Sequence, residues 1–225
     1  MRGSFSYMVV ILGRWAAIST ALWTLLFLMA GTTHLSSLRT FLAALSLVLL
    51  VTMLAVDPRL AYERAHPGPD LSGSNLRFAS GLFFLITLTS AAFFVGRTHT
   101  LVVSTPIRSI ALAIFMSGSF LQTWAMVANP FFSPAVRIQA ERGHKLIDSG
   151  PYRFIRHPGY LAMAFSVPAS AVAIGSWLAL IPAGAFVAAI CERAKLEEQF
   201  LKTNLPGYAE YAKTVPSGLF HFRST

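Results

Sequence analysis

The sequence predicts an all-α polytopic membrane protein with about four full spans plus a C-terminal helical hairpin. Of its 225 residues, 55% are hydrophobic and only 12% are charged, whereas soluble domains carry about 25% charged residues. The mean hydropathy is +0.60. The apolar residues also gather in long runs, as membrane spans require. We expect a single membrane domain over 1–225, with N-terminal spans in 1–128 and a connector, hairpin and C-terminal helix in 129–225.

Four stretches that are almost free of charge have the length of membrane-spanning helices: 15–31, 38–56, 76–95 and 107–127. About 20 apolar residues in a helix cross the hydrocarbon core of a bilayer. The first stretch has no convincing small-residue cleavage site after a short apolar core, so we expect it to be retained as a span. Arg14 lies near its end and can reach the membrane surface with its long side chain.

The fifth apolar stretch, 161–190, is too long for one upright span, because at ~1.5 Å per residue it would extend roughly 45 Å. It contains Pro168, Gly175, Ser176 and Pro182, residues that bend or end helices. We therefore predict two shorter helices that turn back at Gly175-Ser176. An even number of crossings returns the residues on either side of the stretch to the same face of the membrane.

Charge placement sets the predicted orientation, with the N-terminus in the cytoplasm. Most of the 18 basic residues and all nine acidic residues then fall on the cytoplasmic side, as the positive-inside rule favours. The assigned basic residues are Arg2, Arg59, Arg64, Arg77, Arg137, Arg142, Lys145, Arg153, Arg156, Arg193, Lys195, Lys202, Lys213 and Arg223. The net charge of +9 is thus a feature of topology, and we expect no nucleic-acid partner.

Two cytoplasmic connectors carry dense polar sequence. The first, 57–70, is either an interfacial connector with a local ion pair or a lid over a site. The second, 131–157, interleaves aromatic and basic residues, which suits contact with anionic headgroups or the walls of a pocket. The lone Cys191 excludes an intramolecular disulfide, and we expect no metal site.

The second connector ends in a sequence typical of a helix start. Proline is favoured at the first position of a helix, so Pro158 predicts a helix with His157 at its N-cap. The free N–H groups of the next residues, Gly159, Tyr160 and Leu161, could then bind an anion, with Arg156 beside them. The alternative is a helix start whose basic residues meet lipid phosphates.

Beyond the predicted hairpin, Arg193 and Glu197 are four residues apart and can share a helix face. A salt-bridged surface helix is the simple alternative. Together with the His157 segment, however, this face offers cations for a carboxylate, acids for an ammonium group and aromatic rings for a flat base. Those are the binding requirements of a nucleoside-linked amino acid.

The ordered motifs of residues 129–220 resemble the isoprenylcysteine carboxyl methyltransferase family. They are Arg137-Ile-Gln139, Arg142-Gly-His144, Gly150-Pro-Tyr152, Arg156-His-Pro-Gly-Tyr160 and Glu197-Glu198-x-x-Leu201. The resemblance implies a methyltransferase that binds S-adenosylmethionine in a cytoplasmic cofactor pocket. The cofactor-binding residues that it implies are His144, Lys145, Leu146, Gly150, Tyr152, His157, Pro158, Tyr160 and Glu197. The catalytic candidates are Arg193, Glu198 and Arg156.

Methyl transfer to a carboxylate needs no general base, because the nucleophile is already ionised at neutral pH. Alignment and water exclusion suffice, so we assign His157 to binding. Arg193, or else Arg156, would steer the carboxylate. We expect a lipophilic or lipidated substrate to enter from the bilayer of a bacterial inner membrane, among membrane lipids.

Three alternatives remain open at this point. A lipid-amine (phospholipid) N-methyltransferase would need a base, for which Glu198 or His144 is the candidate. A sterol-reductase-like membrane enzyme would bind NADPH at a similar place. A non-enzymatic membrane protein is the third alternative.

Overall fold

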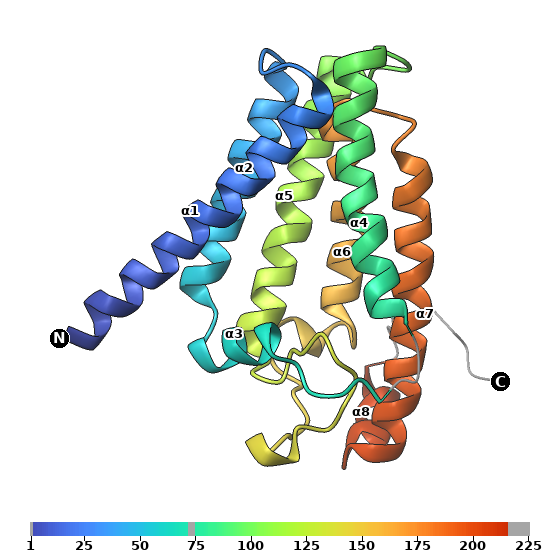
Figure 1. Ribbon diagram of the computed structural model, residues 1–225. Coiled ribbons are helices and arrows are strands. Elements are labelled where there is room, and N and C mark those ends of the chain that lie inside the picture. The colour runs from blue at the N-terminus through green and yellow to red at the C-terminus, as the bar shows by residue number, and fades with distance from the viewer. Residues whose placement is uncertain (1, 72–74, 216–225) are drawn as a thin grey trace.

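The computed structural model describes residues 2–71 and 75–215, and Arg223 lies outside them. This part of the chain is helical and contains no strand, which confirms the all-α prediction. Figure 1 shows the long helices side by side as a bundle, with α3 and α8 at one end. The α-helices are α1 Arg2–Ala30, α2 Ser36–Ala55, α3 Pro58–Ala65, α4 Leu76–Phe93, α5 Thr105–Ala128, α6 Pro158–Ile174, α7 Leu180–Asn204 and α8 Tyr208–Thr214.

Four helices are long and apolar enough to cross a membrane: Tyr7–Ala30, Ser36–Ala55, Leu76–Thr98 and Thr105–Ala128. The predicted number of spans is confirmed, and this is an integral membrane protein. The first span begins earlier than predicted, because α1 continues as a helix through Arg14. The third ends later, because a π-helical turn, η1 Phe94–Thr98, follows α4.

The predicted hairpin is also confirmed. Helix α6 ends at Ile174, and Gly175 follows with φ 125°, in the region that favours glycine. The turn is tied to the loop before α5, because the Val103 N–H donates to the Gly175 carbonyl at 2.8 Å. Pro182 does not end α7, since it lies in the first turn, where a missing N–H has little cost.

Helix α6 lies inside the bundle, where it packs against α2, α4, α5 and α7. Small side chains allow this close packing: a Cβ on Gly118 of α5 would lie 3.0 Å from the Ala162 carbonyl and from the Ser166 Cβ. Because α6 is enclosed on several sides, the position of its first residue, Pro158, is set by the surrounding helices.

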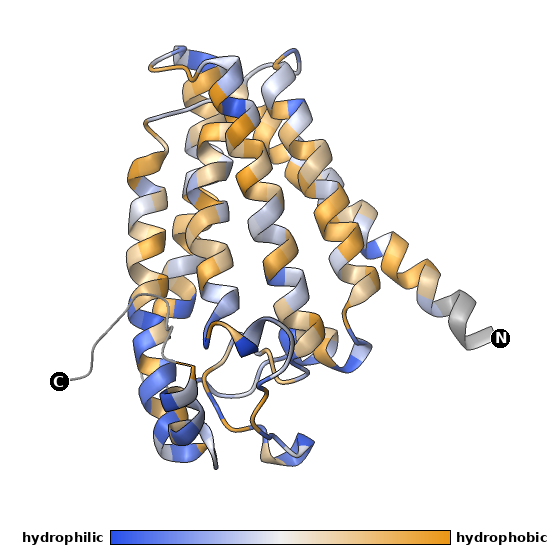
Figure 2. Cartoon of the chain, turned by 180° about the vertical axis from the view of Figure 1, so that it is seen from behind, coloured by the Kyte–Doolittle hydropathy of each residue, from blue (hydrophilic) through white to orange (hydrophobic). Residues whose placement is uncertain are grey.

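The polar residues gather at one end of the bundle. Figure 2 shows the hydrophobic residues along the long helices and the hydrophilic ones on the connector, the end of α7 and α8. Two short 3₁₀ helices lie in the connector, η2 Ala140–Arg142 and η3 Gly150–Arg153. The first connector also lies at this end, where Asp57 caps α3 by accepting from the Arg59 N–H at 2.7 Å. Residues from both connectors and the hairpin can therefore share one site.

Candidate functional site

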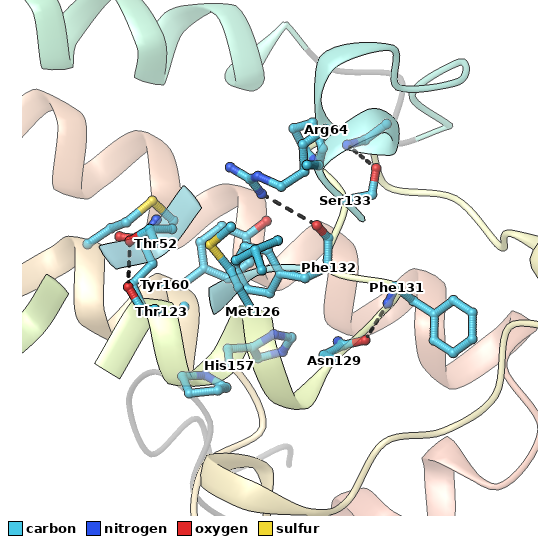
Figure 3. A pocket seen from close by; sticks show the side chains of 18 of the residues that line it. Thr52, Arg64, Thr123, Met126, Asn129, Phe131, Phe132, Ser133, His157 and Tyr160 are labelled. Carbon is cyan, nitrogen blue, oxygen red and sulfur yellow. Dashed lines mark hydrogen bonds between the residues drawn. The ribbon is translucent and has the colours of Figure 1, made fainter. Parts of the chain in front are cut away.

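A cavity of about 1030 Å³ joins the polar end to the interior of the bundle. All eight α-helices contribute to its lining. Its walls run from apolar residues such as Leu45 and Phe115, within the spans, to His157 and Glu197 at the polar end. Figure 3 shows part of this lining. One continuous space therefore has an apolar compartment and a polar one.

The start of α6 forms one wall of the polar compartment. Pro158 is the first helical residue and His157 is the N-cap, as predicted. One detail of that prediction was wrong: the Leu161 N–H is not free, because it donates to the His157 carbonyl at 3.1 Å. The helix start is also covered, since a Cβ on Gly159 would lie 2.5 Å from the Phe132 ring.

Tyr160 joins this wall to α7. Its hydroxyl donates to Glu197 Oε2 at 2.6 Å and accepts from Arg193 Nε at 2.9 Å. Arg193 is buried, donates to the Pro134 carbonyl, and lies 3.6 Å from Asp70. In the described residues Arg193 and Glu197 form no direct ion pair, although they share a helix face. The Tyr160 hydroxyl bridges them.

Glu198 is the centre of a separate cluster and does not line the cavity. Its carboxylate lies 2.7 Å from His157 Nε2, accepts from the Tyr208 hydroxyl at 2.8 Å, and pairs with Arg156 and Lys202, each at 3.1 Å. Burial alone would raise the pKa of Glu198, but His157, Tyr208 and Arg156 outweigh burial and hold this pKa well below its usual range. Glu198 is therefore an ionised anchor.

The partners of Glu198 are held in turn by the C-terminal segment. Arg156 lines the cavity but also donates to the carbonyls of Ala212 and Val215. Burial, followed by the nearby Glu198 charge, raises the pKa of Tyr208, so its hydroxyl stays protonated and can donate. This cluster ties the start of α6 to α7 and α8.

His144 lines the cavity from the second connector. Its Nδ1 accepts from the Gln139 N–H at 3.2 Å, and its ring stacks on Phe131 with centroids 4.5 Å apart. Burial, and then the charges of Arg137 and Arg142, lower the pKa of His144. The ring is therefore neutral at pH 7, and since Nδ1 accepts, its proton is on Nε2.

Of the remaining predicted cofactor residues, Lys145, Leu146 and Tyr152 line the cavity and Gly150 does not. The Tyr152 hydroxyl accepts from Asn129 Nδ2 at 3.3 Å. Gly150 has φ 59°, and a Cβ there would lie 2.9 Å from Ala128 Cβ. Gly150 therefore allows the connector to turn in close contact with the end of α5.

Several lining residues had no assigned role in the sequence prediction: Arg64, Asn129, Phe131, Phe132 and Tyr208. The aromatic pair in the connector, Phe131 and Phe132, was a weak signal in the sequence, because it suits either a membrane surface or a pocket wall.

In the part of the chain that the structure describes, no group of three or more His, Cys, Asp or Glu side chains could hold a metal ion.

Fold and site define a class: an α-helical membrane protein whose connector, hairpin and C-terminal helix build a polar compartment at one end of a cavity between apolar spans. The model of the isoprenylcysteine carboxyl methyltransferase (ICMT) family matches residues 110–203. The predicted resemblance to this family is confirmed. The matched segment contains most of α5, the second connector, α6 and most of α7.

Curated relatives show the same similarity. The chain is 31% identical over 116 residues to protein-S-isoprenylcysteine O-methyltransferase B of Arabidopsis thaliana, covering 50% of this chain and 59% of that protein. It is 29% identical over 112 residues to the protein-S-isoprenylcysteine O-methyltransferase of Schizosaccharomyces pombe, covering 48% of each. The chain thus spans about half the length of the curated relatives that it matches.

Proposed function

We propose that this protein is an S-adenosylmethionine-dependent methyltransferase that O-methylates the carboxylate of a lipophilic acceptor, such as an isoprenylcysteine, at the membrane. The observation that carries the proposal is the Arg193–Tyr160–Glu197 chain, which faces a cavity continuous with the apolar spans. The names of the relatives support carboxyl methylation. The apolar compartment supports a lipophilic acceptor.

The polar compartment offers groups that fit S-adenosylmethionine. Glu197 lines the cavity and has one carboxylate oxygen engaged by Tyr160, so its charge can receive the ammonium group of the cofactor. The neutral His144 presents an Nε2–H donor beside the Phe131 ring, which suits a flat base. Lys145, Leu146, Tyr152, His157 and Pro158 would complete the binding surface. Once bound, the cofactor would supply the methyl group.

The chain's own contribution is orientation. Methyl transfer to an ionised carboxylate needs the acceptor oxygen in line with the donor, together with exclusion of water. Arg193 and Arg156 already have protein partners for their donor groups. We therefore propose that Arg193 positions Tyr160 and Glu197, and that Arg156 and Glu198 hold the start of α6 in place.

Methylation of a lipid amine is the second candidate. It requires a base to take the proton of the acceptor. The lining residue His144 is neutral, but its Nδ1 already accepts from the Gln139 N–H, so this ring would first have to give up that contact, whereas Glu198 is ionised but surrounded by cations and lies outside the lining. The chemical stability of the product separates the two candidates, since methyl esters are labile to base and methylamines are not.

The direct test uses detergent-solubilised protein. We expect calorimetry to detect S-adenosylmethionine binding with a Kd on the micromolar scale, about −8 kcal/mol. Incubation with radiolabelled cofactor and an N-acetylated S-prenylcysteine should place the label in a base-labile ester. Saturable NADPH binding without S-adenosylmethionine binding would instead support a reductase. Base-stable label in a membrane extract would support amine methylation.

We also propose that the single domain 1–225 is in a bacterial inner membrane with its polar end in the cytoplasm. Glu141→Cys and Lys213→Cys, each made in a Cys191→Ser background, should react with an impermeant maleimide only after the inner face is opened. His34→Cys, in the loop at the other end of the bundle (Figure 1), should react in intact cells. Labelling of positions 141 and 213 from opposite sides would contradict the proposed orientation.

A further inference from the structure

Arg64, on α3, is a cation that lines the cavity and has no acidic partner within residues 2–71 and 75–215. No Asp or Glu oxygen of the described residues forms a salt bridge with it, and its guanidinium makes one long polar contact among them, from Nη1 to the Phe132 carbonyl at 3.4 Å. Its guanidinium carbon lies 5.3 Å from the centre of the Phe132 ring. Burial lowers the pKa of Arg64 below its ordinary value. Its charge is therefore partly desolvated, and the described part of the chain provides no anion to balance it.

Arg137, in contrast, is an arginine of the same cavity whose positive charge is balanced by acidic side chains. Arg137 pairs with Glu63 at 2.9 Å and with Glu141 at 2.7 Å. Burial would lower its pKa, but hydrogen bonds and charges from Glu141 and Glu63 outweigh this effect and raise it. Arg64 lies directly after Glu63 in the sequence yet receives no such compensation.

Helix α3 is anchored so that Arg64 stays at the cavity. The Glu63 carboxylate pairs with Arg137 and also accepts from the Ser133 hydroxyl at 3.0 Å. On the adjacent turn, Leu60 is buried with Met126 and Phe132. Two kinds of contact, ionic and apolar, thus hold the short helix against the second connector. This anchoring favours a fixed position for Arg64.

Phe132 places Arg64 between the two compartments. One part of its ring lies against Gly159 at the start of α6, and the ring also packs with Val56 and Met126 at the ends of α2 and α5. In Figure 3, Arg64 extends from α3 toward Phe132, with Met126 and Tyr160 beyond it. An acceptor whose tail occupies the apolar compartment would bring its polar head to this place.

We propose that Arg64 binds the carboxylate of the methyl acceptor. This inference rests on the proposed function and identifies the residue that recognises the acceptor. Three other arginines in the lining have polar or acidic protein partners: Arg193 has Tyr160 and Pro134, Arg156 has Glu198 and the end of α8, and Arg137 has Glu63 and Glu141. Arg14 also lines the cavity but is exposed, within the first span. Arg77, also in the lining, stacks on Phe78 with 4.7 Å between guanidinium carbon and ring centre.

The chemistry predicts which kinetic constant depends on Arg64. In the transfer, a carboxylate oxygen forms a bond to the methyl carbon while the carbon–sulfur bond breaks and its electron pair goes to sulfur. The sulfonium becomes a neutral thioether, and the carboxylate loses its charge as the ester forms. A cation therefore stabilises the bound acceptor at least as much as the transition state, so Arg64 should lower KM without raising kcat.

The experiment compares an N-acetylated S-prenylcysteine with its uncharged carboxamide, as ligands of protein in phosphatidylcholine nanodiscs. We expect the wild type to bind the carboxylate roughly tenfold more tightly, or about 1.4 kcal/mol. Arg64→Met should lose this preference and raise KM for the acceptor with kcat nearly unchanged. Arg64→Lys should retain part of the preference, because it keeps the charge without the planar guanidinium.

The matched control is Arg59→Met, because Arg59 is an exposed arginine on the same helix that does not line the cavity. It should behave as the wild type, and S-adenosylmethionine affinity should be unchanged in all variants. A preference that survives in Arg64→Met would overturn the inference while leaving the proposed function intact. Failure of the wild type to bind either analogue would overturn both.

A lipid phosphate is the other anion that Arg64 could meet. Nanodiscs that contain phosphatidylglycerol distinguish this source, because the lipid would then compete with the carboxylate in the wild type and not in Arg64→Met. We expect no such competition. Competition of that kind would assign Arg64 to the lipid and overturn the inference.

Discussion

Glu197→Gln is expected to weaken S-adenosylmethionine binding at least about tenfold, or about 1.4 kcal/mol. The glutamine keeps the size of the side chain and can still accept from the Tyr160 hydroxyl, which lies 2.6 Å from Glu197. It lacks the negative charge that would face the ammonium group of the cofactor. Calorimetry on purified protein measures the change directly.

The same helix provides a matched control. Glu192 is also on α7, but its side chain is 57% exposed and pairs with Lys195 outside the cavity. Glu192→Gln should bind the cofactor as the wild type does. Unchanged affinity in Glu197→Gln would show that the cofactor is not held at this carboxylate. Tyr160→Phe should give a smaller loss, because it removes the bridge and keeps the charge.

Glu198→Gln is expected to lower the stability of the protein by about 3 kcal/mol, the scale of a broken buried ion pair. The Glu198 side chain is only 14% exposed and has charged or hydrogen-bonding contacts to His157, Arg156, Lys202 and Tyr208. The neutral glutamine would leave Arg156, whose side chain is only 10% exposed, without its acid. Thermal unfolding in detergent should show a clear fall in Tm.

Exposed Glu210 is the control for this variant, because its ion pair with Lys213 lies on α8 and its side chain is 74% exposed. Glu210→Gln should unfold with the wild type, since exposed pairs contribute little to stability. A Glu198→Gln protein with the wild-type Tm would refute the assignment of Glu198 as an anchor.

The difference between the wild type and Glu198→Gln should also depend on pH. The pKa of Glu198 is depressed in the folded protein, so its contribution is present above the unfolded value of 4.5 and is lost as the pH falls toward the folded value. The stability advantage of the wild type should therefore persist at neutral pH and shrink below about pH 4.5. Unfolding by denaturant at several pH values measures it.

The sequence predicted the parts of the fold that depend on local pattern. A backbone in hydrocarbon must satisfy its own hydrogen bonds, so apolar runs of span length become helices, and their number could be counted. Gly175 marked the hairpin, because a positive φ favours glycine. Pro158 marked the start of α6, since proline suits the first helical position.

The site was predictable only in part. The predicted hairpin correctly placed His157 at the same end of the protein as Glu197 and Glu198 of α7. The sequence did not predict that Glu197 would meet Tyr160 in the cavity while Glu198, the next residue, would be enclosed with Arg156. Adjacent residues on a helix point about 100° apart, and which direction faces the cavity depends on how α7 packs.

The sequence by itself therefore determined the membrane fold, the hairpin and the family resemblance, since these follow from residue types at short spacing. Only the tertiary structure decided which charges are paired and which are left for a ligand. Arg137 and Arg64 look alike in the sequence, but Glu63 and Glu141 meet only the first. The physical reason is that electrostatic balance depends on distances of a few ångströms between residues far apart in the chain, and packing alone sets those distances.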